Sequence, residues 1–227
     1  MNEASERSTV NVRVWEWPFR AWHWLFAVTI TASLTTGLAG DIGWMEWHLR
    51  FGYVACGLLL FRVVWGFAGG LYSRWSTYRT SPGRVLSFIR RVGPGQRLSQ
   101  RFEAHTPPGV LLALTMLLVV LVQAGTGLFA TDDIFIEGPF MRYADDEVVE
   151  TLTALHHRVW YLVIAAVAAH ITAQATYGLR RNPLPLAMIT GSKRLPPGLG
   201  DTPSLGWRGV VVGLVSAGLV WVALTLA

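Results

Sequence analysis

Five stretches of the chain are each long and apolar enough to cross a lipid bilayer. They cover roughly residues 22–40, 48–69, 108–130, 155–177 and 207–227. A helix needs about 20 apolar residues to cross a hydrocarbon core about 30 Å thick, because each residue adds about 1.5 Å. The mean hydropathy of +0.39, with 52% apolar and 15% charged residues, agrees with this interpretation. Since backbone groups in lipid must be bonded internally, we expect an all-α integral membrane protein.

The basic residues predict the orientation of these spans. Most arginines lie in the N-terminal arm and in the connections 70–107 and 178–206, whereas residues 41–47 carry none. The 131–154 loop is acidic, with Arg142 as its one basic residue. Because arginine and lysine concentrate on the cytoplasmic side, we expect a multi-pass protein of the bacterial inner (cytoplasmic) membrane with its N-terminus in the cytoplasm. The net charge of +5 is then a topology signal, and no nucleic-acid partner is expected.

The spans and connections predict four parts. We expect a cytoplasmic arm (1–21), a four-helix bundle (22–177), a cytoplasmic connection (178–206) and a fifth, C-terminal transmembrane helix (207–227). The segment SPGRVLSFIRRVG, which follows the second span, predicts a short amphipathic helix lying at the membrane interface. Its apolar residues are Val85, Leu86, Phe88, Ile89 and Val92.

Histidines stand at both ends of the fourth span, LHHRVWYLVIAAVAAHITA. His156 and His170 are fourteen residues apart, which is about 40° short of four full turns, so they share one face about 21 Å apart. His157 lies about 140° away from His170, and we expect it to face headgroups or solvent. Imidazoles are costly in lipid, so a face that carries two of them indicates a functional site.

Alternating helix directions bring further histidines to the same two levels. His48 is level with His156 on the outer side, and His23 is level with His170 on the inner side. Two imidazoles on facing helices provide the axial ligands of a six-coordinate haem iron. The single cysteine, Cys56, excludes an internal disulfide, an iron–sulfur cluster and a CxxCH attachment, so the haem would be non-covalent.

Other residues fit two haems at these levels. Small residues give room for a flat macrocycle, and arginines could pair with haem propionates. The candidates are Gly37, Gly52, Gly125 and Gly127 for space, Arg62 for the inner haem, and Arg158 and Arg50 for the outer haem. Gln123 could hydrogen-bond across helices or line a quinone or haem edge, and the sequence leaves both open. One histidine at a helix end is usually interfacial, but two level pairs favour haem.

The ordered motifs resemble the bacterial cytochrome b561 family. They are VWEWPFRAWHW, WHLRFGYVACGLLLFRVVWGF, EAHTPPG, QAGTGLFATDD, EGPF, LHHRVWYLVIAAVAAH and MITGSKR, from about residue 11 to 194. The nearer likeness is to the b-type cytochrome subunits of nickel–iron hydrogenases. This resemblance implies a four-helix bundle with two b haems, ligated by His23, His48, His156 and His170, the same four residues that the spacing selects. His157 stands where the family usually has an acid, and the fifth helix lies beyond the resemblance.

The expected function is electron transfer through haem b, two per chain, between the quinone pool and a periplasmic redox partner such as a c-type cytochrome. A quinone oxidoreductase activity would use the inner level, near Arg20 and His105, because an imidazole could pass the protons that quinone chemistry needs. His105 is otherwise a simple interfacial residue before Pro107. One alternative is a membrane-anchor cytochrome b subunit of a hydrogenase or other dehydrogenase. Another is a transporter whose histidines line an ion or metal path.

Overall fold

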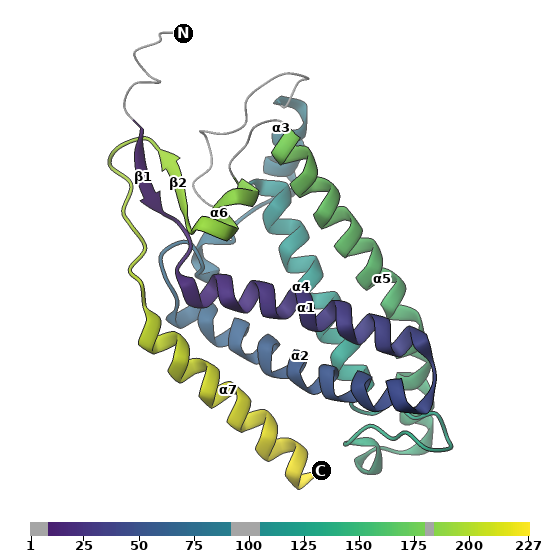
Figure 1. Cartoon of the computed structure of the whole chain (residues 1–227). Helices are drawn as coiled ribbons and strands as arrows, with labels where there is room; N and C mark the ends of the chain where they lie inside the picture. The colour runs from purple at the N-terminus through teal and green to yellow at the C-terminus, as the bar shows by residue number, and fades with distance from the viewer. Residues whose placement is uncertain (1–8, 92–104, 180–183) are drawn as a thin grey trace. The chain divides into compact units, whose positions relative to one another are not determined.

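The structure is a computed structural model that describes residues 9–91, 105–179 and 184–227. Five long helices dominate it: α1 (Trp17–Ala39), α2 (Ile42–Ala68), α4 (Pro107–Gly127), α5 (Asp146–Leu179) and α7 (Gly206–Leu226). The all-α prediction is confirmed (Figure 1). Val92 of the predicted amphipathic helix lies outside the described ranges, as do five arginines of the predicted cytoplasmic segments: Arg7, Arg97, Arg101, Arg180 and Arg181.

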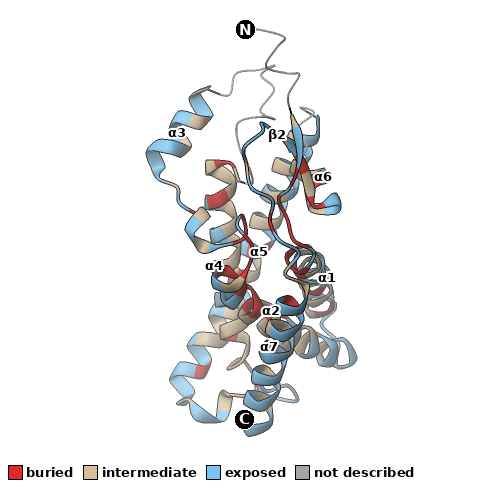
Figure 2. Ribbon diagram, turned by 90° about the vertical axis from the view of Figure 1, so that its left-hand side faces the viewer, coloured by how far each residue is buried: buried red, intermediate tan, exposed pale blue. Residues whose placement is uncertain are grey.

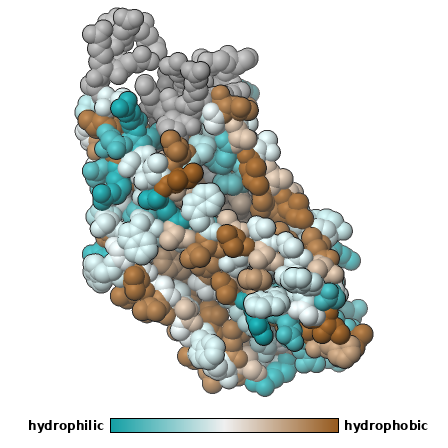
Figure 3. Space-filling view, viewed as in Figure 1, coloured by the Kyte–Doolittle hydropathy of each residue, from teal (hydrophilic) through white to brown (hydrophobic). Residues whose placement is uncertain are grey.

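Four of the described helices, α2, α4, α5 and α7, are long and apolar enough to span a membrane. The first predicted span corresponds to α1, whose 23 residues would cover about 35 Å. Tryptophan, threonine and serine dilute the hydropathy of α1, but its length matches a span. Many large apolar side chains on these helices are exposed, including Val28 at 66%, Leu118 at 61% and Leu214 at 70%. Figures 2 and 3 show this largely exposed surface and its hydrophobic areas, as expected for helices that face lipid.

The helices begin where the sequence offers N-terminal caps. The carboxylate of Asp41 accepts a hydrogen bond from the backbone N–H of Trp44, at the start of α2. The hydroxyl of Thr106 accepts one from Gly109, and Pro107 follows Thr106 as the first residue of α4. These are preferred residues at a helix N-terminus, because they satisfy backbone donors that the helix leaves open.

The described residues form two compact units, and each is described by itself. The first unit lies within residues 1–21, 65–114 and 168–209, and the second within 22–64, 115–167 and 210–227. Each of the five long helices contributes an end of at least four residues to the first unit and its remaining length to the second.

The first unit contains a two-stranded antiparallel sheet that was not predicted from the sequence. Strand β1 (Val10–Arg13) pairs with β2 (Ser192–Leu195), so that Val10 faces Leu195 and Arg13 faces Ser192. Helix α6 (Leu184–Thr190) precedes β2 directly (Figure 1). The predicted cytoplasmic arm and the predicted cytoplasmic connection are therefore joined by backbone hydrogen bonds.

A buried carboxylate joins three parts of the first unit. Glu16 is fully buried, and its Oε1 accepts hydrogen bonds from the indole of Trp65 (2.7 Å), the backbone N–H of Gly70 (3.1 Å) and the hydroxyl of Ser73. A Cβ on Gly70 would lie 2.7 Å from the other carboxylate oxygen of Glu16, so the backbone approaches closely only because residue 70 is glycine. The end of α2 and the turn after it are thereby fixed to the residue that precedes α1.

The short amphipathic helix is present as α3 (Pro82–Arg91). Ser81 caps it by accepting a hydrogen bond from the N–H of Arg84. Leu86 and Ile89 are 48% and 60% exposed, respectively. Exposed apolar side chains on a short, polar helix suit the interface between lipid and water.

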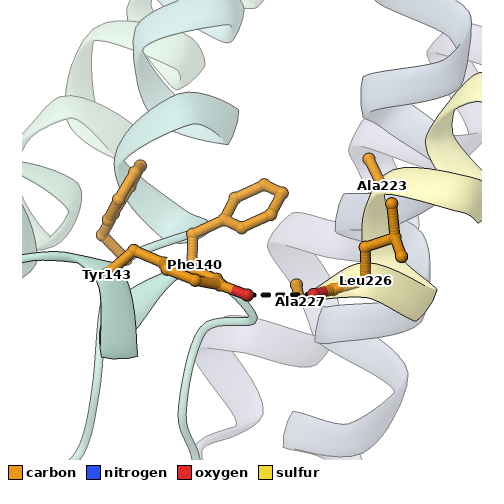
Figure 4. A pocket seen from close by; sticks show the side chains of 6 residues that line it. Phe140, Tyr143, Ala223, Leu226 and Ala227 are labelled. Carbon is orange, nitrogen blue, oxygen red and sulfur yellow. Dashed lines mark hydrogen bonds between the residues drawn. The ribbon is translucent and has the colours of Figure 1, made fainter.

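The second unit has an apolar core between its helices. Leu59 of α2, Val120 of α4 and Val163 of α5 are its buried members, and Phe26 and Leu34 of α1 pack against them. Residues 210–226 of the fifth long helix, α7, also belong to this unit. The last turn of α7 is held by Tyr143, whose hydroxyl donates to the Leu226 carbonyl at 2.9 Å beside an apolar pocket (Figure 4).

Candidate functional site

One cavity of the second unit has two histidines in its wall. It is lined by α1, α2, α4 and α5 together with residues 130–132 and 136 of the loop after α4. His48 and His156 line it with Gly37 and Gly52, as the sequence predicts for the outer level. The lining is otherwise mostly apolar, with Leu34, Ala55, Val120 and Val163 among its residues.

His48 is oriented by a carbonyl of α1. Its Nδ1 lies 2.8 Å from the backbone oxygen of Ser33, and 3.3 Å from the Ser33 hydroxyl. A carbonyl oxygen can only accept, so Nδ1 of His48 carries the proton and donates it. A Cβ on Gly37, four residues after Ser33, would lie 2.7 Å from this nitrogen. The imidazole therefore reaches the helix backbone because residue 37 has no side chain.

His156 repeats this arrangement on α4. Its Nδ1 donates to the backbone oxygen of Gln123 at 2.9 Å, and the Thr126 hydroxyl lies 3.3 Å from the same nitrogen. A Cβ on Gly127, four residues after Gln123, would lie 2.8 Å from the Cε1 atom of the ring. Each histidine thus rests on a pair made of a helix carbonyl and a glycine four residues later, with a hydroxyl beside it.

These hydrogen bonds determine which ring nitrogens are available. With Nδ1 protonated on both histidines, each neutral ring presents Nε2 as its acceptor. A metal-ligating histidine usually donates its other N–H to a carbonyl or carboxylate, which fixes the ring and raises its basicity. His48 and His156 both meet this condition.

The two rings are also spaced as ligands of one metal ion. Their centres are 6.0 Å apart, and their planes cross at 76°. Two metal–nitrogen bonds of about 2 Å, each extended by roughly 1 Å to the ring centre, give about 6 Å. Among the described residues, no group of three or more His, Cys, Asp or Glu side chains could hold a metal ion. Two protein ligands are too few for a closed zinc site, but they are the number that a six-coordinate haem iron takes.

The histidines expected at the inner level fall in different units. His23 lies on the α1 part of the second unit, half-buried, with its ring 5.1 Å from that of Trp24. His170 lies on the α5 part of the first unit, also half-buried. Their pairing on one haem stays a prediction. Arg62, expected beside the inner haem, is 1% exposed in the second unit, with its guanidinium carbon 5.7 Å from the ring centre of Trp22.

The remaining outer-level candidates are mostly exposed. Arg158 and His157 are exposed, and His157 also borders the cavity. Arg50 lies 3.7 Å from Glu46 in an exposed ion pair and packs over the ring of Trp47. A Cβ on Gly52 would meet nothing within 4 Å, so Gly52 borders open space in the cavity. Gly37 borders the same cavity, but the space left by its missing side chain is occupied by the ring of His48.

The two residues expected at the quinone site lie in the first unit, in different surroundings. Arg20 donates to the carbonyls of Met188 and Ile189, where α6 ends, and so holds the turn at Gly191. His105 packs between aromatic rings, with centres 5.1 Å from that of Trp15 and 4.4 Å from that of Tyr78.

Sequence reasoning did not identify Ser33 and Thr126, whose hydroxyls lie beside the two ligand candidates. It left the role of Gln123 open, whereas the structure places this residue against His156. A signal was available: a polar residue is followed by glycine at the fourth position in both Ser33–Gly37 and Gln123–Gly127. Such a pair exposes a helix carbonyl to a neighbouring side chain.

A membrane-spanning helical protein with two carbonyl-bound imidazoles facing an apolar cavity has the features of a membrane b-type cytochrome. The chain belongs to the prokaryotic cytochrome b561 family, whose family model matches residues 14–191. It is also 23% identical, over 83% of this chain and 84% of the relative, to a protein of Rhodobacter capsulatus described as "Probable Ni/Fe-hydrogenase B-type cytochrome subunit". No solved structure matches the chain. Membership of this family supports haem b as the cofactor and electron transfer in a membrane as the activity.

Proposed function

We propose that the chain is a di-haem b-type cytochrome that passes electrons across the bacterial inner membrane, between the quinone pool and a redox partner on the outer side. The observation that carries this proposal is the pair His48 and His156. Their Nδ1 atoms are held by helix carbonyls and their ring centres lie 6.0 Å apart in an apolar cavity. When bound, haem supplies a one-electron carrier, and the chain positions it and sets its potential.

The chain's residues act at the outer level by holding and orienting. Ser33 and Gln123 fix the two rings through their carbonyls, and Gly37 and Gly127 allow that approach. The apolar lining excludes water, which strengthens every charge interaction with the cofactor. We assign the inner haem to His23 and His170, and the neighbouring charge to the buried Arg62, because their helix positions match that level.

The acidic loop after α4 is the proposed docking surface for the outer partner. Residues 130–132 and 136 of this loop line the cavity that contains His48 and His156. Asp132 accepts backbone hydrogen bonds from residues 134, 135 and 136, which hold the loop and lower the pKa of this carboxyl group. Ile134 and Phe135 are 75% and 69% exposed beside these acids. A basic partner such as a c-type cytochrome would complement the charge of this surface.

We place quinone exchange on the inner side, near His105 and Arg20. Reduction of a quinone takes up two protons, and an imidazole titrates near neutral pH. Arg20 is committed to the carbonyls of Met188 and Ile189, so its part is to hold the surrounding turn. The test is His105→Gln with both haems retained: a slower quinol-driven haem reduction supports the site, and a wild-type rate and pH dependence moves it elsewhere.

The second candidate is a membrane-anchor cytochrome b subunit of a hydrogenase or other dehydrogenase. It is favoured by the likeness to the Rhodobacter capsulatus protein, which extends over 83% of the chain. Copurification in mild detergent separates the two. Stoichiometric large subunits containing nickel or other metals support the anchor, and a chain that purifies alone with haem supports a free electron carrier.

The decisive experiment counts haem in the purified protein. Pyridine haemochrome analysis should give two b haems per chain, both extracted by acid–acetone. His48→Ala and His156→Ala should each lose the outer haem, and His23→Ala and His170→Ala the inner one. His157→Ala, the neighbouring control, should keep both. A protein without a Soret band would instead support the transporter alternative, and one haem per chain would refute the di-haem assignment.

A further inference from the structure

The side chain of Gln123 lies against the ring of His156 inside the cavity. Its Nε2 is 3.2 Å from both ring nitrogens of His156. Because Nδ1 already donates to the Gln123 carbonyl, Nε2 is the ring nitrogen left to ligate iron, and the amide nitrogen, equally distant from both ring nitrogens, lies beside the ring and leaves the lone pair of Nε2 available. The amide oxygen of Gln123 is buried and accepts no hydrogen bond from the described residues. The oxygen end of this amide is therefore withdrawn from water.

The contact bears on the angle between the two rings. His48 is held by the carbonyl and hydroxyl of Ser33, and His156 by the carbonyl of Gln123 and the hydroxyl of Thr126. His156 has a further contact with the side-chain amide of Gln123, the residue whose backbone carbonyl already accepts from the ring. The resulting planes cross at 76°. Rotation of the His156 ring would break the amide contact and the carbonyl contact together.

We propose that Gln123 is a positioning residue for the outer haem: its amide packs against the His156 ring, holds that ring nearly perpendicular to the His48 ring, and places the positive end of its NH₂ dipole beside the iron ligand. This inference rests on the proposed function. The angle between axial imidazole planes determines how the iron d orbitals split, which electron paramagnetic resonance reports. A positive dipole end beside the iron favours the reduced state and raises the midpoint potential, because reduction removes a positive charge.

The test compares Gln123→Met and Gln123→Glu with Gln174→Met as the control. Methionine keeps a similar length without a donor, glutamate replaces the NH₂ group by a carboxylate oxygen, and Gln174 is a half-buried glutamine of α5 in the first unit. The readouts are haem content, the low-spin resonance signal of the oxidised protein, and the midpoint potential of each haem. The outer haem is identified as the one missing from His48→Ala.

In the wild type we expect a strongly anisotropic low-spin signal from the outer haem. Gln123→Met should keep both haems, lower the outer potential and make that signal less anisotropic, while the inner haem stays unchanged. Gln123→Glu should lower the outer potential further, because a carboxylate stabilises the oxidised iron. Gln174→Met should match the wild type.

Two results would overturn the inference. The first is a wild-type signal and potential in every Gln123 variant that keeps its haem. The second is loss of the outer haem from both Gln123 variants, which would show a purely structural role. If only Gln123→Met loses the outer haem, the midpoint potential of that haem in Gln123→Glu is the test: a lowered potential supports the inference, and a wild-type potential contradicts it. A wild-type protein without haem would refute the proposed function instead, before any variant is compared.

Discussion

The indole N–H of Trp65 donates to Oε1 of Glu16 at 2.7 Å, inside the first unit and away from water. The same oxygen also accepts from the backbone of Gly70 and the hydroxyl of Ser73. One carboxylate oxygen thus satisfies three buried donors that come from the end of α2 and the turn after it.

Removal of this carboxylate should destabilise the protein. Glu16→Ala removes the acceptor of the Trp65 indole and of the Gly70 backbone N–H, at about 1–3 kcal/mol for each group, whereas the Ser73 hydroxyl keeps the Gly70 carbonyl at 3.2 Å as an acceptor. Glu16→Gln should lower the stability less than Glu16→Ala, because the amide oxygen can replace Oε1 as the acceptor. Its NH₂ group would take the place of Oε2, which accepts no hydrogen bond from the described residues, so no existing bond is lost there. Thermal unfolding in detergent, followed by circular dichroism, measures both. The control is Glu46→Gln in the exposed pair with Arg50, which should change stability by less than about 1 kcal/mol.

Glycines of α1 and α4 should differ sharply in their tolerance of a methyl group, depending on whether they touch a histidine ring. In Gly127→Ala the new Cβ would lie 2.8 Å from the His156 ring, so the ring must move, at a strain of about 1–3 kcal/mol. We expect loss or weakened binding of the outer haem, measured by pyridine haemochrome. Gly37→Ala should act in the same way on His48. Gly125→Ala, two residues from Gly127, meets nothing within 4 Å and should bind both haems. Equal haem content in all three would contradict the proposed seating of the rings.

Lys193 should make stability depend on alkaline pH. It is 2% exposed in β2, and this burial lowers the pKa of its ammonium group from 10.5 to about 8. Between pH 8 and 10.5 the unfolded chain holds a proton that the folded chain has lost, so the free energy of unfolding rises with pH across this window. Below pH 8 the burial cost is present in full.

Lys193→Met should abolish this rise and stabilise the protein at pH 7 by no more than about 3 kcal/mol. Thermal unfolding at pH 7.5 and 9.5 compares the variant with the wild type. Arg194→Gln, at the exposed neighbouring position of the same strand, should leave the pH profile unchanged. A wild-type stability that falls between these two pH values, with no difference from Lys193→Met, would refute the assignment.

The orientation can be tested with phosphatase fusions. A fusion after Glu137, in the acidic loop, should be active outside the inner membrane, and one after Arg91, at the end of α3, should be inactive. The physical reason is the retention of arginine-rich connections in the cytoplasm. Cellular phosphatase activity, normalised to the amount of fusion protein, gives the answer. The reverse pattern would invert the sides assigned to quinone and to the redox partner.

Hydropathy and spacing were sufficient to predict much of the second unit. The long helices follow from the apolar stretches, and His48 and His156 were predicted as a level pair from the alternating directions of the helices. The structure brings their ring centres to 6.0 Å in the wall of one cavity. The support beneath the rings was harder to predict. A carbonyl acceptor such as that of Ser33 exists at every residue, and only the missing side chain at Gly37 makes this one accessible.

The first unit was largely beyond sequence reasoning. Strand β1 has four residues, too few for a clear alternation of apolar and polar positions, and its partner lies more than 170 residues away. Arg20 was predicted beside a quinone from its place near the inner level. That role stays a prediction; the structure adds the contacts of its guanidinium with the carbonyls of Met188 and Ile189, which the sequence did not predict. The positions of acceptors from such distant segments depend on tertiary packing, which no local pattern records.

The pairing of β1 with β2 also imposes an order on synthesis. Residues 10–13 leave the ribosome near the beginning and residues 192–195 near the end, after four of the five long helices have been made. Contacts between such distant segments form late, because a long loop must close first. Strand β1 therefore remains unpaired while those helices enter the membrane. Truncation before residue 192 would leave β1 without its partner, and with a bare strand edge that invites association with other chains.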